Sequence, residues 1–177
     1  CETGICPHGF APMRLKSNTE VNTQTLWGSI GWATPAAFGG QMAARDRRTI
    51  LLTGEGSHQL TATEISNMMK NELKPVIFVI NNNGYTIERV LSNEVDDFFN
   101  DVIEWDYSKL PSVFKGNAWV KQVKTNAELD EALKQAEIEQ KSKLCYIELF
   151  TEQMDLPNIT AQIFKIIKEK RVSAFSQ

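Results

Sequence analysis

The sequence has little of what would place a protein in a membrane, in a signal-directed pathway or on a nucleic acid. Its longest uninterrupted apolar run, residues 76–80, is far shorter than the ~20 residues that a membrane-spanning helix needs. Its first residues have neither the charged start nor the apolar stretch of a signal peptide. Nineteen Lys and Arg against 22 Asp and Glu leave a net charge of -3 without a basic stripe. Neither a membrane nor a nucleic acid is therefore an expected partner.

Cysteine and histidine, the residues of most zinc sites, are scarce, with three and two copies. A chain of this size does not depend on disulfides, and the odd cysteine count favours a reducing cytoplasm. Cys1, Cys6 and His8 lie close together in the sequence, but their spacing matches no standard zinc pattern. The chain has no initiator Met, and we expect it to be a fragment of a longer polypeptide.

What is present is ordinary globular usage in one domain. Hydrophobic residues make up 42% and charged residues 23% of the 177 positions, which is typical of a chain that buries a core. No internal repeat, low-complexity block or linker rich in Gly, Ser or Pro divides it. We therefore treat residues 1–177 as a single α/β domain.

Strands and helices are predicted to alternate along the chain. Short apolar runs predict strands over residues 49–53, 75–80, 118–123 and 144–150. The first two are typical of strands covered on both faces in a parallel sheet. This order predicts a doubly wound parallel sheet with helices on both faces, in which ligands bind at the carboxyl ends of the strands.

The predicted helices have recognisable starts. Thr34 followed by Pro35 predicts an N-cap and a first helical position, and Thr61 with Glu64 predicts a capping box. A third helix is expected to begin near Thr125 or Asn126. Its predicted buried residues are Leu129, Ala132, Leu133 and Ala136, and a C-terminal helix is predicted from the apolar stripe Ile159, Ile163, Ile166 and Ile167.

Two loops contain the residues best suited to chemistry. Gly54-Glu55-Gly56-Ser57 follows the first predicted strand, and Asn81-Asn82-Asn83-Gly84 follows the second. In a parallel sheet both loops lie at the same edge and can be neighbours. Glu55 and an Asn carboxamide would give Mg²⁺ the oxygen ligands it prefers, with water and a phosphate group supplying the rest. Ser57 and the amides leading into the Thr61 helix could then receive the oxygens of a diphosphate. Either loop alone would be interpreted as an ordinary turn.

The two loops together resemble the thiamine diphosphate motif of thiamine-dependent enzymes. The motif is carried here by Gly54-Glu55-Gly56, 24 further residues and Asn81-Asn82. Residues 26–32 and 82–88 are similar to the pyruvate and indolepyruvate decarboxylase branch, and the resemblance runs from Glu2 to about Pro157. It implies the thiamine diphosphate-binding fold and the C-terminal, diphosphate-binding domain of a three-domain enzyme, with thiamine diphosphate and Mg²⁺ as cofactors.

The resemblance assigns the metal ligands. Mg²⁺ would be held by Glu55, by the side chain of Asn82 and by the main-chain oxygen of Gly84. Glu55 stands where the family usually has Asp, which is a departure from the pattern. Because Glu is one methylene longer, the cation or the loop must shift by about an ångström, and an octahedral ion with bonds of ~2.1 Å tolerates such a shift poorly. A weakened or lost metal site is the alternative.

The resemblance also assigns residues to the organic cofactor. The carbonyl of Gly28 would accept a hydrogen bond from the aminopyrimidine ring, and Ile30 would support the bent form of the cofactor, although ordinary packing is the alternative for an isoleucine. Ile5 stands where a polar residue for the diphosphate is usual, and His58 could lie near the diphosphate or serve as a surface or capping residue. The complete cofactor set is Thr3, Gly28, Ser29, Ile30, Gly54, Glu55, Gly56, Ser57, Asn82, Gly84, Tyr85, Thr86 and Ile87.

Glu88 matches the catalytic glutamate of the family. It lies just past the end of the second strand, where a carboxylate that moves protons would need to be. The alternative is a solvated carboxylate in the first turn of a helix, where its charge is favourable. Ile87 and Leu91 would then line the substrate pocket.

The function implied is the non-oxidative decarboxylation of pyruvate, indolepyruvate or a related 2-oxo acid to an aldehyde and CO₂. The site would be completed by a pyrimidine-binding domain in a homodimer or homotetramer, and this chain alone would be inactive. One alternative is an acetolactate synthase-like carboligase or oxidase. Another is a diphosphate-binding module without catalysis, in which Glu55 and Ile5 mark decay.

Overall fold

Four parallel strands form the centre of the molecule in the computed structural model, which describes residues 1–92 and 98–175. The strands lie in the order β1-β2-β4-β3, and each neighbouring pair is parallel. Their bounds are β1 Ile50–Gly54, β2 Val76–Asn81, β3 Ala118–Val123 and β4 Leu144–Phe150. The four strands predicted from apolar runs are confirmed to within a residue.

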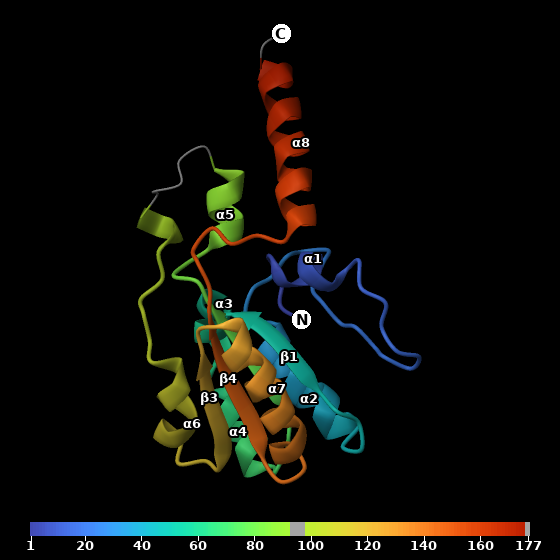
Figure 1. Ribbon diagram of the computed structural model, residues 1–177, viewed down its shortest axis with the longest axis vertical. Helices are drawn as coiled ribbons and strands as arrows, with labels where there is room; N and C mark the ends of the chain where they lie inside the picture. Colours follow the sequence, from blue (N-terminus) through green and yellow to red (C-terminus); the bar gives the residue numbers. More distant parts are fainter. Residues whose placement is uncertain (93–97, 176–177) are drawn as a thin grey trace.

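Helices connect and cover the strands (Figure 1). In chain order they are α1 Cys6–Phe10, α2 Ala33–Ala43, α3 Glu55–Thr61, α4 Glu64–Lys70, α5 Thr86–Leu91, α6 Leu110–Val113, α7 Asn126–Glu139 and α8 Asn158–Phe175. Two short 3-10 helices, η1 Phe98–Asn100 and η2 Tyr107–Lys109, lie between α5 and α6. None of the helices among the described residues is both long and apolar enough to cross a membrane.

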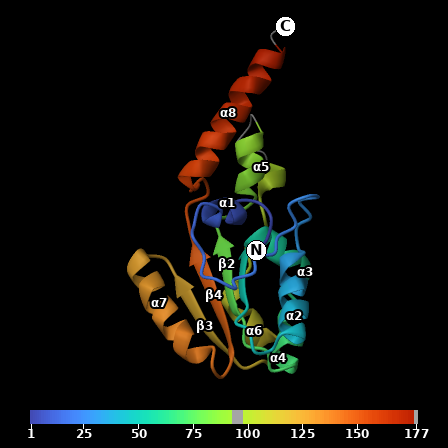
Figure 2. The same cartoon turned by 90° about the vertical axis from the view of Figure 1, so that its right-hand side faces the viewer.

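The sheet has a hydrophobic core on each face. Ile77 and Val79 of β2 point to one face, where they pack with apolar side chains of α2, α4 and α6. Val76 and Phe78 point to the other face and pack with α7. Figure 2 shows α7 and α2 on opposite sides of the strands. The expectation of a doubly wound parallel sheet with helices on both faces is confirmed.

Two of the predicted helix starts are wrong, for identifiable reasons. α2 begins at Ala33, so Thr34 lies inside the helix. The buried carboxylate of Glu2 accepts hydrogen bonds from the N–H groups of Gly31 and Ala33 (3.0 and 3.2 Å) and so caps this end in place of the threonine. Thr61 ends α3 instead of starting a helix, because its hydroxyl donates to the Gly31 carbonyl at 2.8 Å.

The third helix begins as predicted, with Thr125 as the N-cap of α7 and Glu128 completing a capping box. Ala132 and Ala136 are buried, but Leu133 is 46% exposed, so its predicted burial is wrong. α8 is also present. Its buried side chains are Thr160 and Phe164, whereas the predicted stripe is largely exposed at Ile159, Ile163 and Ile166. α8 extends away from the sheet beside α1 and α5 (Figures 1 and 2).

The two leucines of different burial give a matched test of this packing. Leu144 on β4 is 1% exposed, and Leu133 on α7 is 46% exposed. Leu144→Ala should lower the free energy of unfolding by about 2–5 kcal/mol, because it removes buried methyl groups and leaves a cavity. Leu133→Ala should lower it by less than about 1 kcal/mol. Urea unfolding of both variants measures this, and equal losses would contradict the described packing.

Candidate functional site

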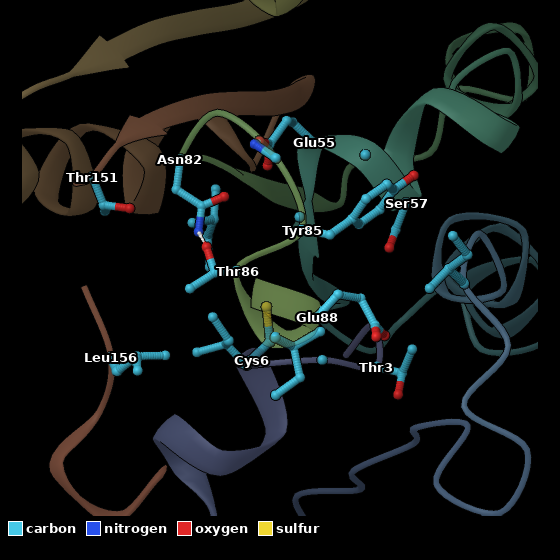
Figure 3. A pocket seen from close by; sticks show the side chains of 18 of the residues that line it. Thr3, Cys6, Glu55, Ser57, Asn82, Tyr85, Thr86, Glu88, Thr151 and Leu156 are labelled. Atoms are coloured by element: carbon cyan, nitrogen blue, oxygen red, sulfur yellow. Dashed lines mark hydrogen bonds between the residues drawn. The ribbon is translucent and has the colours of Figure 1, made fainter. Parts of the chain in front are cut away.

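The carboxyl ends of β1 and β2 bring the two candidate loops together. Gly54 pairs with Ile80 in the register of the sheet. α3 begins at Glu55 directly after β1, and Asn82 follows β2 directly. Both residues lie on a cavity of about 780 Å³ at this edge of the sheet (Figure 3). The predicted residues that line this cavity are Thr3, Gly28, Ile30, Gly54, Glu55, Gly56, Ser57, Asn82, Gly84, Tyr85, Thr86, Ile87 and Glu88.

Three oxygen-bearing groups converge at one end of the cavity. One terminal atom of the Asn82 carboxamide lies 3.2 and 3.3 Å from the two carboxylate oxygens of Glu55 and 3.0 Å from the carbonyl oxygen of Gly84. Neighbouring ligands of an octahedral Mg²⁺ with bonds of ~2.1 Å stand about 3 Å apart. The spacing of Glu55, Asn82 and Gly84 therefore fits a hard divalent cation.

The buried carboxylate of Glu55 is suited to pairing with a cation. Its side chain is 3% exposed, and burial raises its pKa above the usual value, although the Gly84 N–H donates to it at 2.6 Å and works in the opposite direction. A buried carboxylate is stabilised by a nearby cation.

The loop after β2 has a conformation that depends on glycine. Asn83 and Gly84 both have positive φ, at 60° and 125°, where Asn and Gly are the least strained residues. A Cβ on Gly84 would overlap the carbonyl oxygen of Asn100 and stand 2.6 Å from the guanidinium of Arg89. The loop is also fixed by the Tyr85 N–H, which donates to the Asn100 carbonyl at 2.8 Å.

A second glycine lets two parts of the cavity wall touch. A Cβ on Gly56 would stand 2.6 and 2.8 Å from ring atoms of Tyr85. Only glycine therefore lets the Tyr85 ring lie against the start of α3. This contact links the loop after β1 to the loop after β2.

Two buried carboxylates that sequence reasoning missed hold the cavity walls. Besides capping α2, Glu2 accepts from the Thr3 N–H at 3.1 Å, so it ties the segment bearing Thr3 to the loop that precedes α2. Glu148 on β4 is 1% exposed and accepts from the side chains of Asn81 and Gln122, at 2.8 and 2.9 Å. It thereby fixes the residue that precedes Asn82.

Glu88 lies in the first turn of α5 and has an exposed side chain on the cavity. In Figure 3 it is drawn on the side of Thr3, away from Glu55 and Asn82. Ile87 lies beside it on the cavity wall. Ser29 and Leu91, although they belong to the described part of the chain, are not among the lining residues. The expectation that those two face the cavity is therefore not met.

His58 does not lie at the cavity or at the surface. It belongs to α3 and is fully buried, with its Nδ1 3.1 Å from the hydroxyl of Thr34, and its ring tilts against that of Tyr146. Burial lowers its pKa from 6.5 to about 4, so the ring is neutral at neutral pH. Its expected roles near the diphosphate or at the surface are wrong.

Sequence reasoning also missed two parts of the cavity wall. Cys6, at the start of α1, lines the cavity, as do Thr151 and residues 155–157 after β4. The segment after β4 could have been found, because β4 is parallel to β2 and ends at the same edge. For Cys6, the sequence suggested only a zinc ligand together with Cys1 and His8, at a spacing that matches no standard pattern. No cluster of three or more His, Cys, Asp or Glu positioned for a metal occurs among residues 1–92 and 98–175.

The sequence matches a known family. Residues 3–149 match the family model described as the thiamine pyrophosphate enzyme, C-terminal TPP binding domain. The chain belongs to this family. Thiamine pyrophosphate is another name for thiamine diphosphate, so the resemblance drawn from the two loops is confirmed.

Several curated relatives of this TPP-binding domain are named as decarboxylases. An alpha-keto-acid decarboxylase of Mycobacterium tuberculosis is 36% identical over 163 residues, which is 92% of this chain and 29% of the relative. One of Mycobacterium avium is 35% identical over 165 residues, 93% of this chain and 29% of the relative. A pyruvate decarboxylase of Aspergillus terreus is 40% identical over 161 residues, 88% of this chain and 28% of the relative. The chain thus spans less than a third of each.

The TPP-binding domain should not tolerate a side chain at Gly84. Gly84→Ala should lower the free energy of unfolding by about 2 kcal/mol or more, because the residue has a positive φ and its Cβ would overlap Asn100. Gly39→Ala is the matched control, since Gly39 lies inside α2 with open space around it. That variant should be neutral or more stable by up to about 1 kcal/mol. Urea unfolding without cofactor compares them, and an unaffected Gly84→Ala protein would refute the described loop.

Burial of His58 should make the domain sensitive to acid. Between pH 6.5 and about 4 the unfolded chain binds a proton at this ring that the folded chain does not. Stability should therefore be complete above pH 6.5 and fall as the pH is lowered towards 4, by up to about 1.4 kcal/mol per unit. In His58→Asn this contribution should disappear, while an Asn side chain can still face Thr34. Unfolding midpoints of both proteins at pH 7 and pH 5 test this. The same pH dependence in both would be the contrary result.

Proposed function

We propose that this domain is the diphosphate- and Mg²⁺-binding part of a 2-oxo acid decarboxylase, which converts pyruvate, indolepyruvate or a related acid to an aldehyde and CO₂ without oxidation. The observation that carries the proposal is the convergence of Glu55, Asn82 and the Gly84 carbonyl on a cavity that Glu88 also lines. The names of the curated relatives support the same reaction class.

The metal and the diphosphate would lie at the end of the cavity next to β1 and β2. Glu55, Asn82 and the Gly84 oxygen would hold Mg²⁺, and the cation would bridge to the phosphate oxygens. Ser57 is buried in the first turn of α3, and its hydroxyl is a suitable partner for those oxygens. When bound, thiamine diphosphate supplies the electron sink for loss of CO₂.

The rest of the cavity would position the cofactor and the substrate. Gly28 and Ile30 also line the cavity and would orient the aminopyrimidine end. Glu88 is close enough to the cavity to exchange a proton with the reacting substrate, and Ile87 would exclude water beside it. Leu156, which also lines the cavity, is a better candidate for the substrate pocket than Leu91.

The walls of the cavity are incomplete within this domain. Leu26 and Trp27, which directly precede Gly28 in the sequence, are 80% and 79% exposed, and Ile30 is 43% exposed. Exposed apolar groups of this size are typical of an interface. We propose that a pyrimidine-binding domain, from the same chain or a partner, covers them in a homodimer or homotetramer.

We also propose a cytoplasmic location, which fits the three free cysteines.

The role of Glu88 can be tested in the complete polypeptide. Glu88→Gln should keep thiamine diphosphate affinity, because the side chain lies away from the proposed metal ligands, but lower turnover by about 100-fold or more through loss of proton transfer. Glu131→Gln, an exposed change on α7, is the control. Calorimetric cofactor binding and steady-state aldehyde formation are the two measurements. Unchanged turnover would remove Glu88 from the reaction.

The product separates this proposal from its alternatives. The complete polypeptide with thiamine diphosphate, Mg²⁺ and pyruvate or indolepyruvate should release one aldehyde for each CO₂. Acetolactate as the main product would indicate a carboligase instead. Cofactor binding without CO₂ release from a panel of 2-oxo acids would indicate a binding module.

A further inference from the structure

The side chain of Asn82 can face the cation site in two ways that differ by a half-turn of its carboxamide. One terminal atom lies by Glu55 and the Gly84 carbonyl, and the other lies 2.6 Å from the hydroxyl of Thr86. Only the orientation with oxygen towards Glu55 offers a ligand to a cation. The orientation with nitrogen towards Glu55 would instead donate hydrogen bonds to the carboxylate and the carbonyl.

Without a cation, the acceptors of Glu55 and Gly84 favour the nitrogen beside them, whereas the hydrogen bonds of Thr86 favour the oxygen there. Its hydroxyl lies 2.6 Å from the main-chain carbonyl oxygen of Gln153. A carbonyl oxygen can only accept, and a hydroxyl has one proton, so Thr86 donates that proton to Gln153. The Thr86 oxygen is then left to accept, and the group that can donate to it is the nitrogen of Asn82 (Figure 3).

The reverse orientation would leave a conflict at Thr86. The oxygen of Asn82 and the carbonyl oxygen of Gln153 would then compete for one proton at 2.6 Å each. Thr86 is 2% exposed, and Asn82 is 8% exposed. Water is therefore poorly placed to satisfy the losing acceptor, and an unsatisfied buried acceptor is unfavourable.

The carbonyl of Gln153 is itself held in place. The Thr151 N–H donates to the Asn81 carbonyl at 3.1 Å, and the Gln153 side chain donates to the Asn83 carbonyl at 3.1 Å. The segment after β4 is thus hydrogen-bonded to the loop after β2 on both sides of Asn82. The acceptor for Thr86 is a main-chain carbonyl that the Gln153 side chain helps to hold in place.

We propose that Thr86 is a positioning residue for the divalent cation: by donating to the Gln153 carbonyl, its hydroxyl is left to accept from the Asn82 nitrogen and so favours the orientation in which Asn82 presents its oxygen to a cation held with Glu55 and Gly84. The inference rests on the proposed cation site. Without the hydroxyl, Asn82 is free to turn its nitrogen to Glu55 and the Gly84 carbonyl, and those hydrogen bonds compete with the metal.

The test is the affinity for Mn²⁺, followed by the electron paramagnetic resonance signal of the free ion. It uses the complete polypeptide with a fixed concentration of thiamine diphosphate and a protein-free blank. Thr86→Val, which has the same shape, should weaken Mn²⁺ binding by about tenfold. Thr86→Ser keeps the hydroxyl and should stay within about threefold of the natural protein.

The same substitution made in an Asn82→Asp protein distinguishes an effect on the orientation of the residue 82 side chain from an effect on the packing of the loop. In Asn82→Asp both terminal atoms are oxygens, so a half-turn changes nothing. Adding Thr86→Val to Asn82→Asp should therefore weaken Mn²⁺ binding by less than about threefold relative to Asn82→Asp alone, so that the two changes are not additive. An equal loss in both backgrounds would mean that Thr86 only supports the loop and would overturn the inference.

The remaining outcomes are also decisive. If the natural protein binds Mn²⁺ and Thr86→Val binds it equally well, the inference fails while the proposed cation site stands. If the natural protein with cofactor binds no Mn²⁺, the proposed cation site itself fails. Thermal unfolding without metal checks the fold of each variant. A Thr86→Val protein that melts with the natural protein yet gains less stability from Mn²⁺ would support the inference independently.

Discussion

The parallel pairing of β1 with β2 is the constraint on which the site depends. It brings Glu55 and Gly84, 29 positions apart in the sequence, within one hydrogen bond of each other at the carboxyl edge of the sheet. Neither loop alone would hold a cation, because one supplies a carboxylate and the other supplies a carboxamide and a carbonyl oxygen. The two hydrophobic cores that cover the sheet faces keep this pairing in register.

Buried polar groups transmit that constraint to the cavity walls. Glu2 fixes the loop before α2, and Glu148 fixes Asn81. The Thr86 hydroxyl links the Asn82 carboxamide to the Gln153 carbonyl. Each of these groups has defined partners in a water-poor environment, where a lost hydrogen bond is unfavourable. Side chains that never touch a cofactor can therefore control how well the site binds one.

Much of the fold could be predicted from the sequence, because apolar runs and loop spacing report on the parallel sheet directly. Glu55 and an Asn carboxamide followed as candidate metal ligands from the same rule, since residues after parallel strands share one edge, whereas Asn82 and the Gly84 carbonyl were assigned by the family resemblance. The starts of α2 and α4 could not be predicted, because Glu2 caps α2 and the Thr61 hydroxyl donates to the Gly31 carbonyl, both through contacts between distant segments. The buried state of His58 and the role of Gln153 likewise depend on tertiary contacts that leave no local pattern.

The most direct test of the account is the position of the cation. Anomalous diffraction from crystals of the complete polypeptide with thiamine diphosphate and Mn²⁺ would locate it. The account predicts a peak about 2.2 Å from a Glu55 carboxylate oxygen, the Asn82 carboxamide oxygen and the Gly84 carbonyl oxygen. A cofactor bound with its cation away from these three groups would contradict it.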